Sequence, residues 1–134
     1  MQVLRKDLLP TLPWYTRWSG LLNDYYNTSA INDVLRSRDK FAVKEMWARD
    51  LPAGIDIDSV LACIGDEMGW NIPSFISQDE CFIVLKLWWH GMVDAMERER
   101  TIISLEKIVG KKFKVDDWTK LNSMTLSGLI DHFQ

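Results

Sequence analysis

The sequence predicts an all-α protein, a bundle of about five to seven helices. Three observations support this fold class. Apolar residues recur at helical spacing along most of the 134 residues, helix-capping residues precede these segments, and glycine or proline follows several of them. Apolar residues make up 47% of the chain and charged residues 26%, so the chain can form a hydrophobic core. The length fits one domain with a small appendage.

The N-terminal part predicts two or three helices. Pro13 suits the first position of a helix whose apolar face contains Trp14, Trp18, Leu21, Leu22 and Tyr25. Asn27–Ser29 predicts a break. Residues 30–51 then predict two short helices or one kinked helix that ends before Pro52. Their apolar positions are Ile31, Val34, Leu35, Phe41, Val43, Met46 and Trp47.

The central part predicts a helix that Asp56 or Asp58 caps and Gly69 ends. Its apolar stripe contains Val60, Leu61, Ile64 and Met68. After a loop, Ser77 and Glu80 match a capping box and predict another helix start. The apolar run Phe82–Trp89 fits a buried helix or a buried strand, and the cap favours the helix.

The C-terminal part contains a second start signal, Asp94 with Glu97, which predicts a new helix at position 94. Gly110 ends this helix, and its broad apolar face contains Ile102, Ile103, Leu105, Ile108 and Val109. A short turn or helix opens at Val115–Trp118. Thr125 caps the last helix, whose inward face contains Leu126, Leu129, Ile130 and Phe133.

Charge and cysteine content exclude several function classes. The net charge is −3 and no basic run resembles a nucleic-acid footprint, so no nucleic-acid partner is expected. Two cysteines, Cys63 and Cys81, are too few for a disulfide framework and suit reduced core positions. No signal peptide is recognisable, and no apolar run approaches the roughly 20 residues that span a bilayer. A soluble cytoplasmic protein without membrane contact is the expectation.

Catalytic and metal sites are not predicted. On one helix, Cys81 and His90 would lie about 13.5 Å apart along the axis, which is too far for a thiol–imidazole pair. A pairing of Cys63 with His132 stays open but has no supporting pattern. The cysteines and histidines lack zinc-ligand spacing, and no glycine-rich phosphate loop is present. We therefore expect a protein that is not an enzyme and holds no metal.

Three stretches, Ser59–Gly69, Asp94–Phe113 and Leu121–Phe133, are similar to the first, second and final helices of acyl carrier proteins. Residues 57–133 therefore resemble an acyl carrier protein, and the C-terminal unit is predicted to span 57–134. Residues 1–50 have no counterpart in a simple carrier and form a Trp-rich helical extension. The two parts are expected to pack as one unit.

The resemblance implies an attachment serine after the aspartate that opens the second helix, where the helix N-terminus favours the phosphate of a phosphopantetheine arm. This chain has Ala95 there, and without a hydroxyl no phosphopantetheine is expected. Ser59, in the triplet Asp58-Ser59-Val60, is the fallback attachment site. The simpler interpretation of Ser59 is a residue in a helix-capping turn.

These observations predict a protein-binding module built on a degenerate carrier-like bundle. Carriers present their second helix to partners, so its candidate contact residues are Met96, Glu97, Arg98 and Arg100. Trp88 and Trp89 are further candidates, because adjacent indoles on a helix cannot both face the same core. The alternative is a small bacterial immunity protein, antitoxin or inhibitor that covers a basic partner surface. A homodimer through the apolar segment "FIVLKLWWHGM" also stays open.

Overall fold

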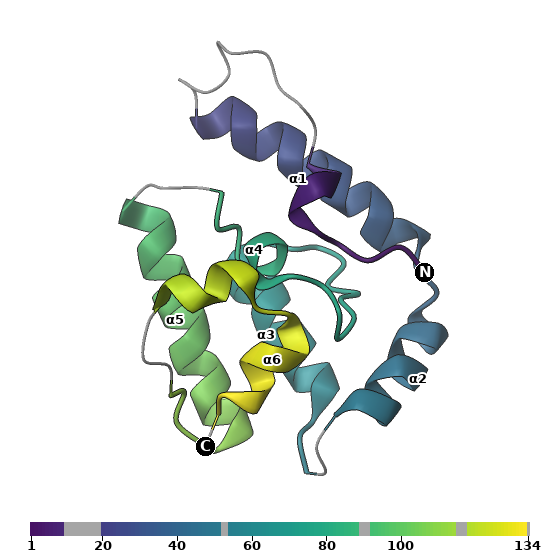
Figure 1. The fold of residues 1–134 in the computed structure, drawn as a ribbon, viewed down its shortest axis with the longest axis vertical. Coiled ribbons are helices and arrows are strands. Elements are labelled where there is room, and N and C mark those ends of the chain that lie inside the picture. Colours follow the sequence, from purple (N-terminus) through teal and green to yellow (C-terminus); the bar gives the residue numbers. More distant parts are fainter. Residues whose placement is uncertain (10–19, 52–53, 89–91, 115–117, 134) are drawn as a thin grey trace.

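The computed structural model describes residues 1–9, 20–51, 54–88, 92–114 and 118–133. Over these residues the chain is helical and contains no strand, which confirms the all-α fold class (Figure 1). The elements, in order, are η1 (Lys6–Leu8), α1 (Gly20–Ser37), α2 (Lys40–Asp50), α3 (Ile57–Met68), α4 (Cys81–Val84), α5 (Met92–Val109), η3 (Trp118–Ser123) and α6 (Leu126–Asp131).

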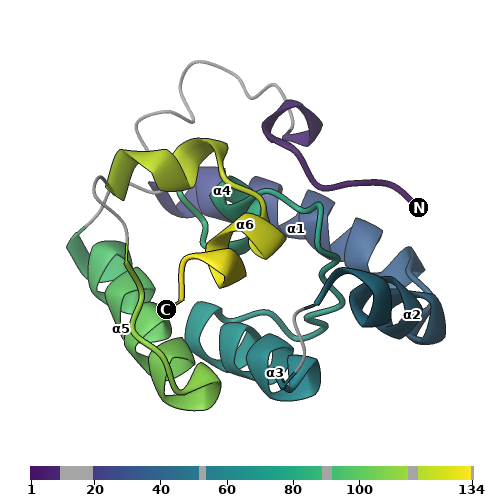
Figure 2. The same ribbon diagram turned by 60° about the horizontal axis from the view of Figure 1, so that its bottom comes forward.

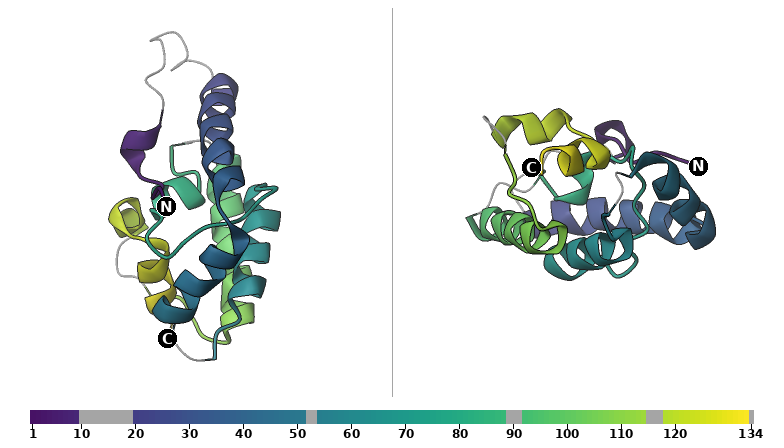
Figure 3. Two further views of the ribbon diagram at one scale, coloured as in Figure 1. Left: turned by 90° about the vertical axis from the view of Figure 1, so that its right-hand side faces the viewer. Right: turned by 90° about the horizontal axis from the view of Figure 1, so that it is seen from below.

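Two layers enclose the short helix α4. The helices α3 and α5 lie side by side in one layer (Figure 2). The helices η3 and α6 form the other, and both contact α4 between the layers (Figure 3). The long helix α1 continues through a tight corner into α2, which lies beside α3 at one edge of the molecule.

The N-terminal half differs from its prediction in one respect. The helix α1 runs unbroken through Asn27–Ser29, so the predicted break is wrong. Asn27 is buried on the same helix as Ile31 and Leu35, and this packing outweighs the tendency of these residues to start a new helix. Residues 10–19, which carry the start of the predicted first helix, lie outside the described residues. The corner predicted between residues 30 and 51 forms where Asp39 caps α2, and α2 ends at Asp50, before Pro52.

The prediction for α3 is confirmed by its caps and its buried face. The Asp56 carboxylate accepts hydrogen bonds from the amides of Asp58 and Ser59, and Gly69 adopts the left-handed conformation (φ +76°) that ends the helix. Val60, Ile64 and Met68 are buried on one face.

The predicted capping box at Ser77 and Glu80 is wrong. α4 begins only at Cys81, and Glu80 makes no side-chain cap. The Ser77 hydroxyl donates to the Asp50 carboxylate instead. The helical interpretation of the following run holds for Cys81–Val84 alone, because the chain then turns, with Lys86 at φ +52°. The described part of this run contains no strand.

The helix α5 is separate from α4, as predicted, but it begins at Met92, so Asp94 lies within its first turn instead of before it. Gly110, at φ +76°, follows its last residue. The apolar face is narrower than predicted, since Ile102 and Leu105 are buried but Ile103 and Ile108 are exposed. In α6, Thr125 Oγ1 accepts a hydrogen bond from Gly128 N (3.2 Å), and all four predicted apolar positions are buried.

Indole rings contribute to the described core. Trp47, Trp70 and Trp88 are buried. Trp47 Nε1 donates to Phe75 O (2.8 Å) and Trp70 Nε1 to Val84 O (2.9 Å), so two rings also hold the backbone around α4. The rings of Trp14, Trp18, Trp89 and Trp118 lie outside the described side chains. Among the described helices, none combines the length and apolar character needed to cross a membrane.

Candidate functional site

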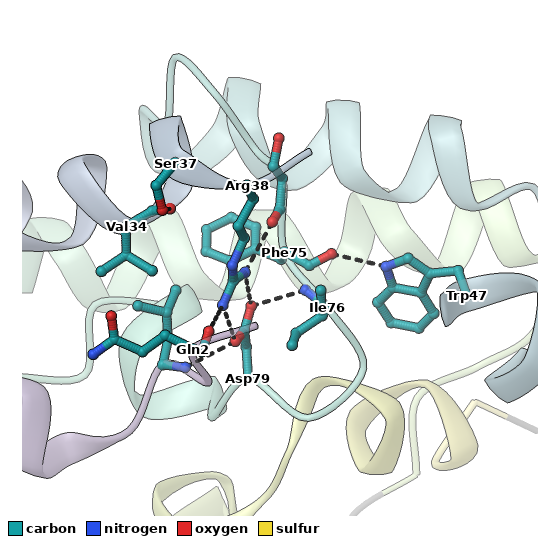
Figure 4. A network of polar contacts seen from close by, with 10 residues as sticks. Gln2, Val34, Ser37, Arg38, Trp47, Phe75, Ile76 and Asp79 are labelled. Atoms are coloured by element: carbon teal, nitrogen blue, oxygen red, sulfur yellow. Dashed lines mark hydrogen bonds and ion pairs between the residues drawn. The ribbon is translucent and has the colours of Figure 1, made fainter. Parts of the chain in front are cut away.

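A buried ion pair between Arg38 and Asp79 lies at the centre of a polar network in the described structure (Figure 4). Arg38 lies just beyond α1 and Asp79 in the loop before α4. The guanidinium meets the carboxylate through two bonds, Nη1 to Oδ2 (2.7 Å) and Nη2 to Oδ1 (2.8 Å). The two side chains are 1% and 0% exposed. Such a bidentate pair fixes both side chains in orientation as well as in distance.

Backbone groups of the N-terminal segment and of the loop before α4 extend this network. Arg38 donates to Ser74 O (2.9 Å) and Gln2 O (2.7 Å). The Asp79 carboxylate accepts from Leu4 N (3.0 Å) and Ile76 N (2.8 Å). The pair therefore ties the N-terminal segment and the end of α1 to the loop before α4. The same loop accepts the Trp47 indole from α2 at Phe75 O.

This network is structural and presents no open surface to a ligand, because both charged side chains are covered. The sequence pattern did not identify either residue. Their separation of 41 positions leaves no helical or capping spacing that could relate them. The sequence shows only that Arg38 and Asp79 are charged residues without an oppositely charged partner at helical spacing to suggest burial. Most charged residues lie on protein surfaces, so this does not predict a buried pair.

An exposed surface lies along α5. Met96 is 61% exposed and Ile103 is 46% exposed. They are two helical turns apart and therefore lie on one face. Glu99, Arg100 and Lys107 are exposed between and beside them. We call these five residues the α5 outer face. The opposite side of α5, with Ile102 and Leu105, is buried.

Only part of the predicted contact set belongs to this face. Met96 and Arg100 belong to it, and Arg100 Nε also lies 3.7 Å from Glu67 Oε2 on α3. Glu97 and Arg98 are half-buried on the flanks of the helix. Ile103 and Lys107 were not predicted as contacts. The sequence did contain an indication, because Ile103 follows Met96 by seven residues and Lys107 follows Arg100 by seven residues, which places each pair on one helix face.

The tryptophan pair does not provide a described contact surface. Trp88 is 7% exposed, and its ring packs near Phe82, with 6.4 Å between the ring centroids. Such a ring does not suit a partner-contacting anchor. Trp89 lies outside the described residues. The homodimer prediction rests on the segment Phe82–Met92. Among its described side chains, Ile83, Val84 and Leu85 are fully buried and Phe82 and Leu87 are half-buried, whereas the side chains of residues 89–92 lie outside those described.

Ser59 lies in the first turn of α3, in the capping turn that its simpler interpretation requires. Its hydroxyl donates to Asp56 Oδ2 (2.7 Å), and its amide lies 3.4 Å from Asp56 Oδ1. These bonds from Ser59 lower the pKa of the Asp56 carboxyl, because they stabilise its ionised form. The hydroxyl is thus engaged with a carboxylate. The side chain of Ala95, the other position of interest, lies outside the described side chains.

Ser59→Ala is expected to raise the pKa of Asp56 toward its ordinary value, because the largest cause of the lowering is the Ser59 hydroxyl. The lowered pKa makes the ionised cap a stabilising group above the ordinary carboxyl pKa, and this contribution is lost as the pH falls through the lowered value. An NMR titration that follows the Asp56 carboxyl carbon in both proteins measures the shift. Identical titration curves would contradict this role of Ser59.

The described cysteines do not suit nucleophilic catalysis. Burial raises the pKa of Cys81 to about 12, so this thiol stays protonated at neutral pH. Burial, followed by Glu67 and Asp66, also raises the pKa of the half-buried Cys63. His132 Nδ1 lies 2.7 Å from Gly128 O, a backbone contact within α6 and its C-cap. Among the described residues, no group of three or more His, Cys, Asp and Glu side chains could hold a metal ion.

Comparisons with known protein families, with curated proteins and with solved structures find no match to this chain.

Proposed function

We propose that this chain is a non-enzymatic protein-binding module whose contact surface is the α5 outer face. The observation that carries the proposal is the exposure of Met96 and Ile103 on one face of the same helix, with charged residues around them. Single exposed apolar residues are common on protein surfaces. Two large ones in register, with a charged border, are typical of a helix that meets a partner groove.

The apolar part of this face can supply binding free energy. Full burial of a Met or Ile side chain is worth about 1.5–3 kcal/mol each. Methionine and arginine are also enriched in interfaces, since methionine adapts to irregular surfaces and arginine forms several directed hydrogen bonds. Met96, Ile103 and Arg100 thus form a suitable centre for a contact of modest size.

The charged part of this face favours an acidic partner surface. Arg100 and Lys107 belong to the face together with Glu99, and Arg100 also pairs with Glu67. Lys111 and Lys112 follow at the C-terminal end of the helix, where cations are stabilised by the helix dipole, so cations outnumber carboxylates along this surface. Glu106 accepts a hydrogen bond from Phe113 N (3.0 Å) and lies 4.0 Å from Lys112 Nζ, so it is already engaged within the chain. These cations do not suit the basic partner that an immunity protein or inhibitor of the alternative kind requires.

The resemblance to acyl carrier proteins is part of this proposal. The three stretches that carry it overlap the helices α3, α5 and α6, and in this proposal α5 corresponds to the helix that carriers present to partners. The module works without an arm, because Ala95 has no hydroxyl and the Ser59 hydroxyl is bonded to Asp56. Mass spectrometry after incubation with a phosphopantetheinyl transferase should leave the mass unchanged. A gain at Ser59 would instead support a true carrier.

Site-specific photocrosslinking in the native cells tests the proposed surface. A photoreactive phenylalanine analogue at Ile103 should give one discrete crosslinked product, because this position lies at the centre of the interface. The matched control is the same analogue at Phe41, which is 69% exposed on α2 and lies away from α5. No product at position 103, or the same product at position 41, would overturn the proposal.

The purified partner then allows a quantitative check. Met96→Ala and Ile103→Ala should each weaken binding by about tenfold, as for central interface residues. Lys107→Glu should also weaken binding, and its effect should be larger at low salt than at high salt, because salt screens the attraction between charges. Phe41→Ala should leave the dissociation constant unchanged, and isothermal titration calorimetry measures all four values.

A further inference from the structure

A second surface feature lies on other elements, where α2, α3 and the loop of residues 71–74 meet. It is a groove of about 270 Å³. Its walls contain Lys40, Val43, Lys44, Asp58, Leu61, Ala62, Asn71, Ile72, Pro73 and Ser74. This volume lies just below the range of about 300–1,000 Å³ that is typical of small-molecule sites. The groove therefore suits a small organic molecule and not a protein segment.

The groove has an apolar floor held by close packing. Val43 is buried, and Leu61 and Ile72 are half-buried. The loop lies so near α3 that a Cβ atom added at Gly65 would meet Pro73 Cγ at 3.0 Å. Ser74 O, at the end of the loop, accepts a bond from the buried Arg38 guanidinium. The floor is thus anchored on both sides and is formed before any ligand arrives, which lowers the entropic cost of binding.

The rim of the groove is positively charged on the α2 side. Lys40 and Lys44 are one turn apart on this helix, and both are exposed. Lys44 Nζ lies 3.5 Å from Asp58 Oδ2. The groove lining thus contains two ammonium groups, from Lys40 and Lys44, and one carboxylate, from Asp58. The N-terminus of α2 is already capped by the Asp39 carboxylate, so the charge preference of the groove rests on the two lysines. The nearby Asp39 carboxylate accepts a bond from Phe41 N and does not line the groove.

We infer that this groove binds a small organic anion, a molecule with a short apolar body and one carboxylate. The apolar body lies on Val43, Leu61 and Ile72, and the carboxylate lies at Lys40. The ammonium group of Lys44 is already paired with the Asp58 carboxylate, so Lys40 is the main determinant of the preference for an anion. The site is independent of the α5 outer face, because it involves neither that helix nor its charged residues.

Titration of the ¹⁵N-labelled full chain with 4-phenylbutyrate, followed by NMR, tests the inference. The expected result is a set of saturable amide shifts confined to α2, the first half of α3 and residues 71–74. Two probes of the same size, 4-phenylbutan-1-ol and 4-phenylbutylamine, should bind at least threefold more weakly, in keeping with one exposed charge interaction. Equal binding of the three probes, or no saturable shifts up to the solubility limit, would overturn it.

Variants separate the apolar and charged parts of the site. Lys40→Gln should weaken binding of 4-phenylbutyrate by about threefold and leave binding of the alcohol unchanged. Ala62→Trp, at an exposed wall position, should fill the groove and abolish binding of both probes, while the amide spectrum stays that of the folded chain. Lys114→Gln, at an exposed position that lies neither in the groove nor on the α5 outer face, is the matched charge control and should leave binding of both probes unchanged. Unaltered binding in Ala62→Trp would also overturn the inference.

Discussion

Arg38→Met is expected to lower the free energy of unfolding by about 3–5 kcal/mol, the usual cost of leaving one partner of a buried ion pair alone. The substitution removes both bonds to the Asp79 carboxylate and leaves that charge in a fully buried position. It also leaves Gln2 O and Ser74 O without the guanidinium that they accept from. Urea denaturation followed by far-UV circular dichroism measures the change.

Two comparisons identify the cause of that loss. Arg36→Met removes a pair with Asp33 that is exposed to solvent, with 3.7 Å between Nη2 and Oδ1, and should change stability by at most about 0.5 kcal/mol. The double variant Arg38→Met/Asp79→Asn should be more stable than Arg38→Met alone, because it no longer buries an unpaired charge. If Arg38→Met costs as little as Arg36→Met, the buried pair does not hold the N-terminal segment and the loop together.

Trp47→Ala is expected to lower the free energy of unfolding by about 3–5 kcal/mol, because it opens a cavity in the core and removes the indole donor to Phe75 O. Trp47→Phe keeps a ring in the core and should cost less. The matched control is Phe41→Ala on the same helix, where the ring is exposed, with an expected change within about 0.5 kcal/mol. Urea titration by circular dichroism measures all three, and equal costs at positions 47 and 41 would contradict the described orientation of α2.

Several helix ends were predictable because their causes are local. The side chains of Asp56 and Thr125 accept hydrogen bonds from backbone amides two or three residues further along the chain. Gly69 and Gly110 adopt the left-handed backbone conformation, which residues other than glycine rarely adopt. The inward faces of α3 and α6 follow from the same local geometry, since helical spacing alone brings their apolar residues to one side.

The capping-box prediction is wrong because both of its residues found distant partners. Ser77 has the spacing of a capping box with Glu80, but its hydroxyl donates to Asp50, and Glu80 Oε1 accepts from Lys6 N (2.7 Å). Asn27 lies in the middle of α1 and is buried. A pattern of neighbouring residues cannot reveal the partners of Ser77 and Glu80, because Asp50 and Lys6 lie in segments remote along the chain, nor can it reveal that Asn27 is buried.

The α5 outer face was predictable only in part. The sequence identified Met96 and Arg100 through the family resemblance, but it assigned Ile103 to the core, since apolar periodicity does not tell how wide a face the neighbouring helix covers. In the structure, Ile102 and Leu105 are buried but Ile103 is exposed, while α5 meets α3 through Arg100 and Ser104, which both contact Glu67.

The sequence alone therefore determined the helical class and those helix ends whose hydrogen bonds close within one turn. The tertiary structure decided the Arg38–Asp79 network, the exposed face of α5 and the groove beside α2. The physical reason is that capping and helical spacing depend on neighbours along the chain, whereas burial and exposure depend on which distant segments exclude water from a side chain.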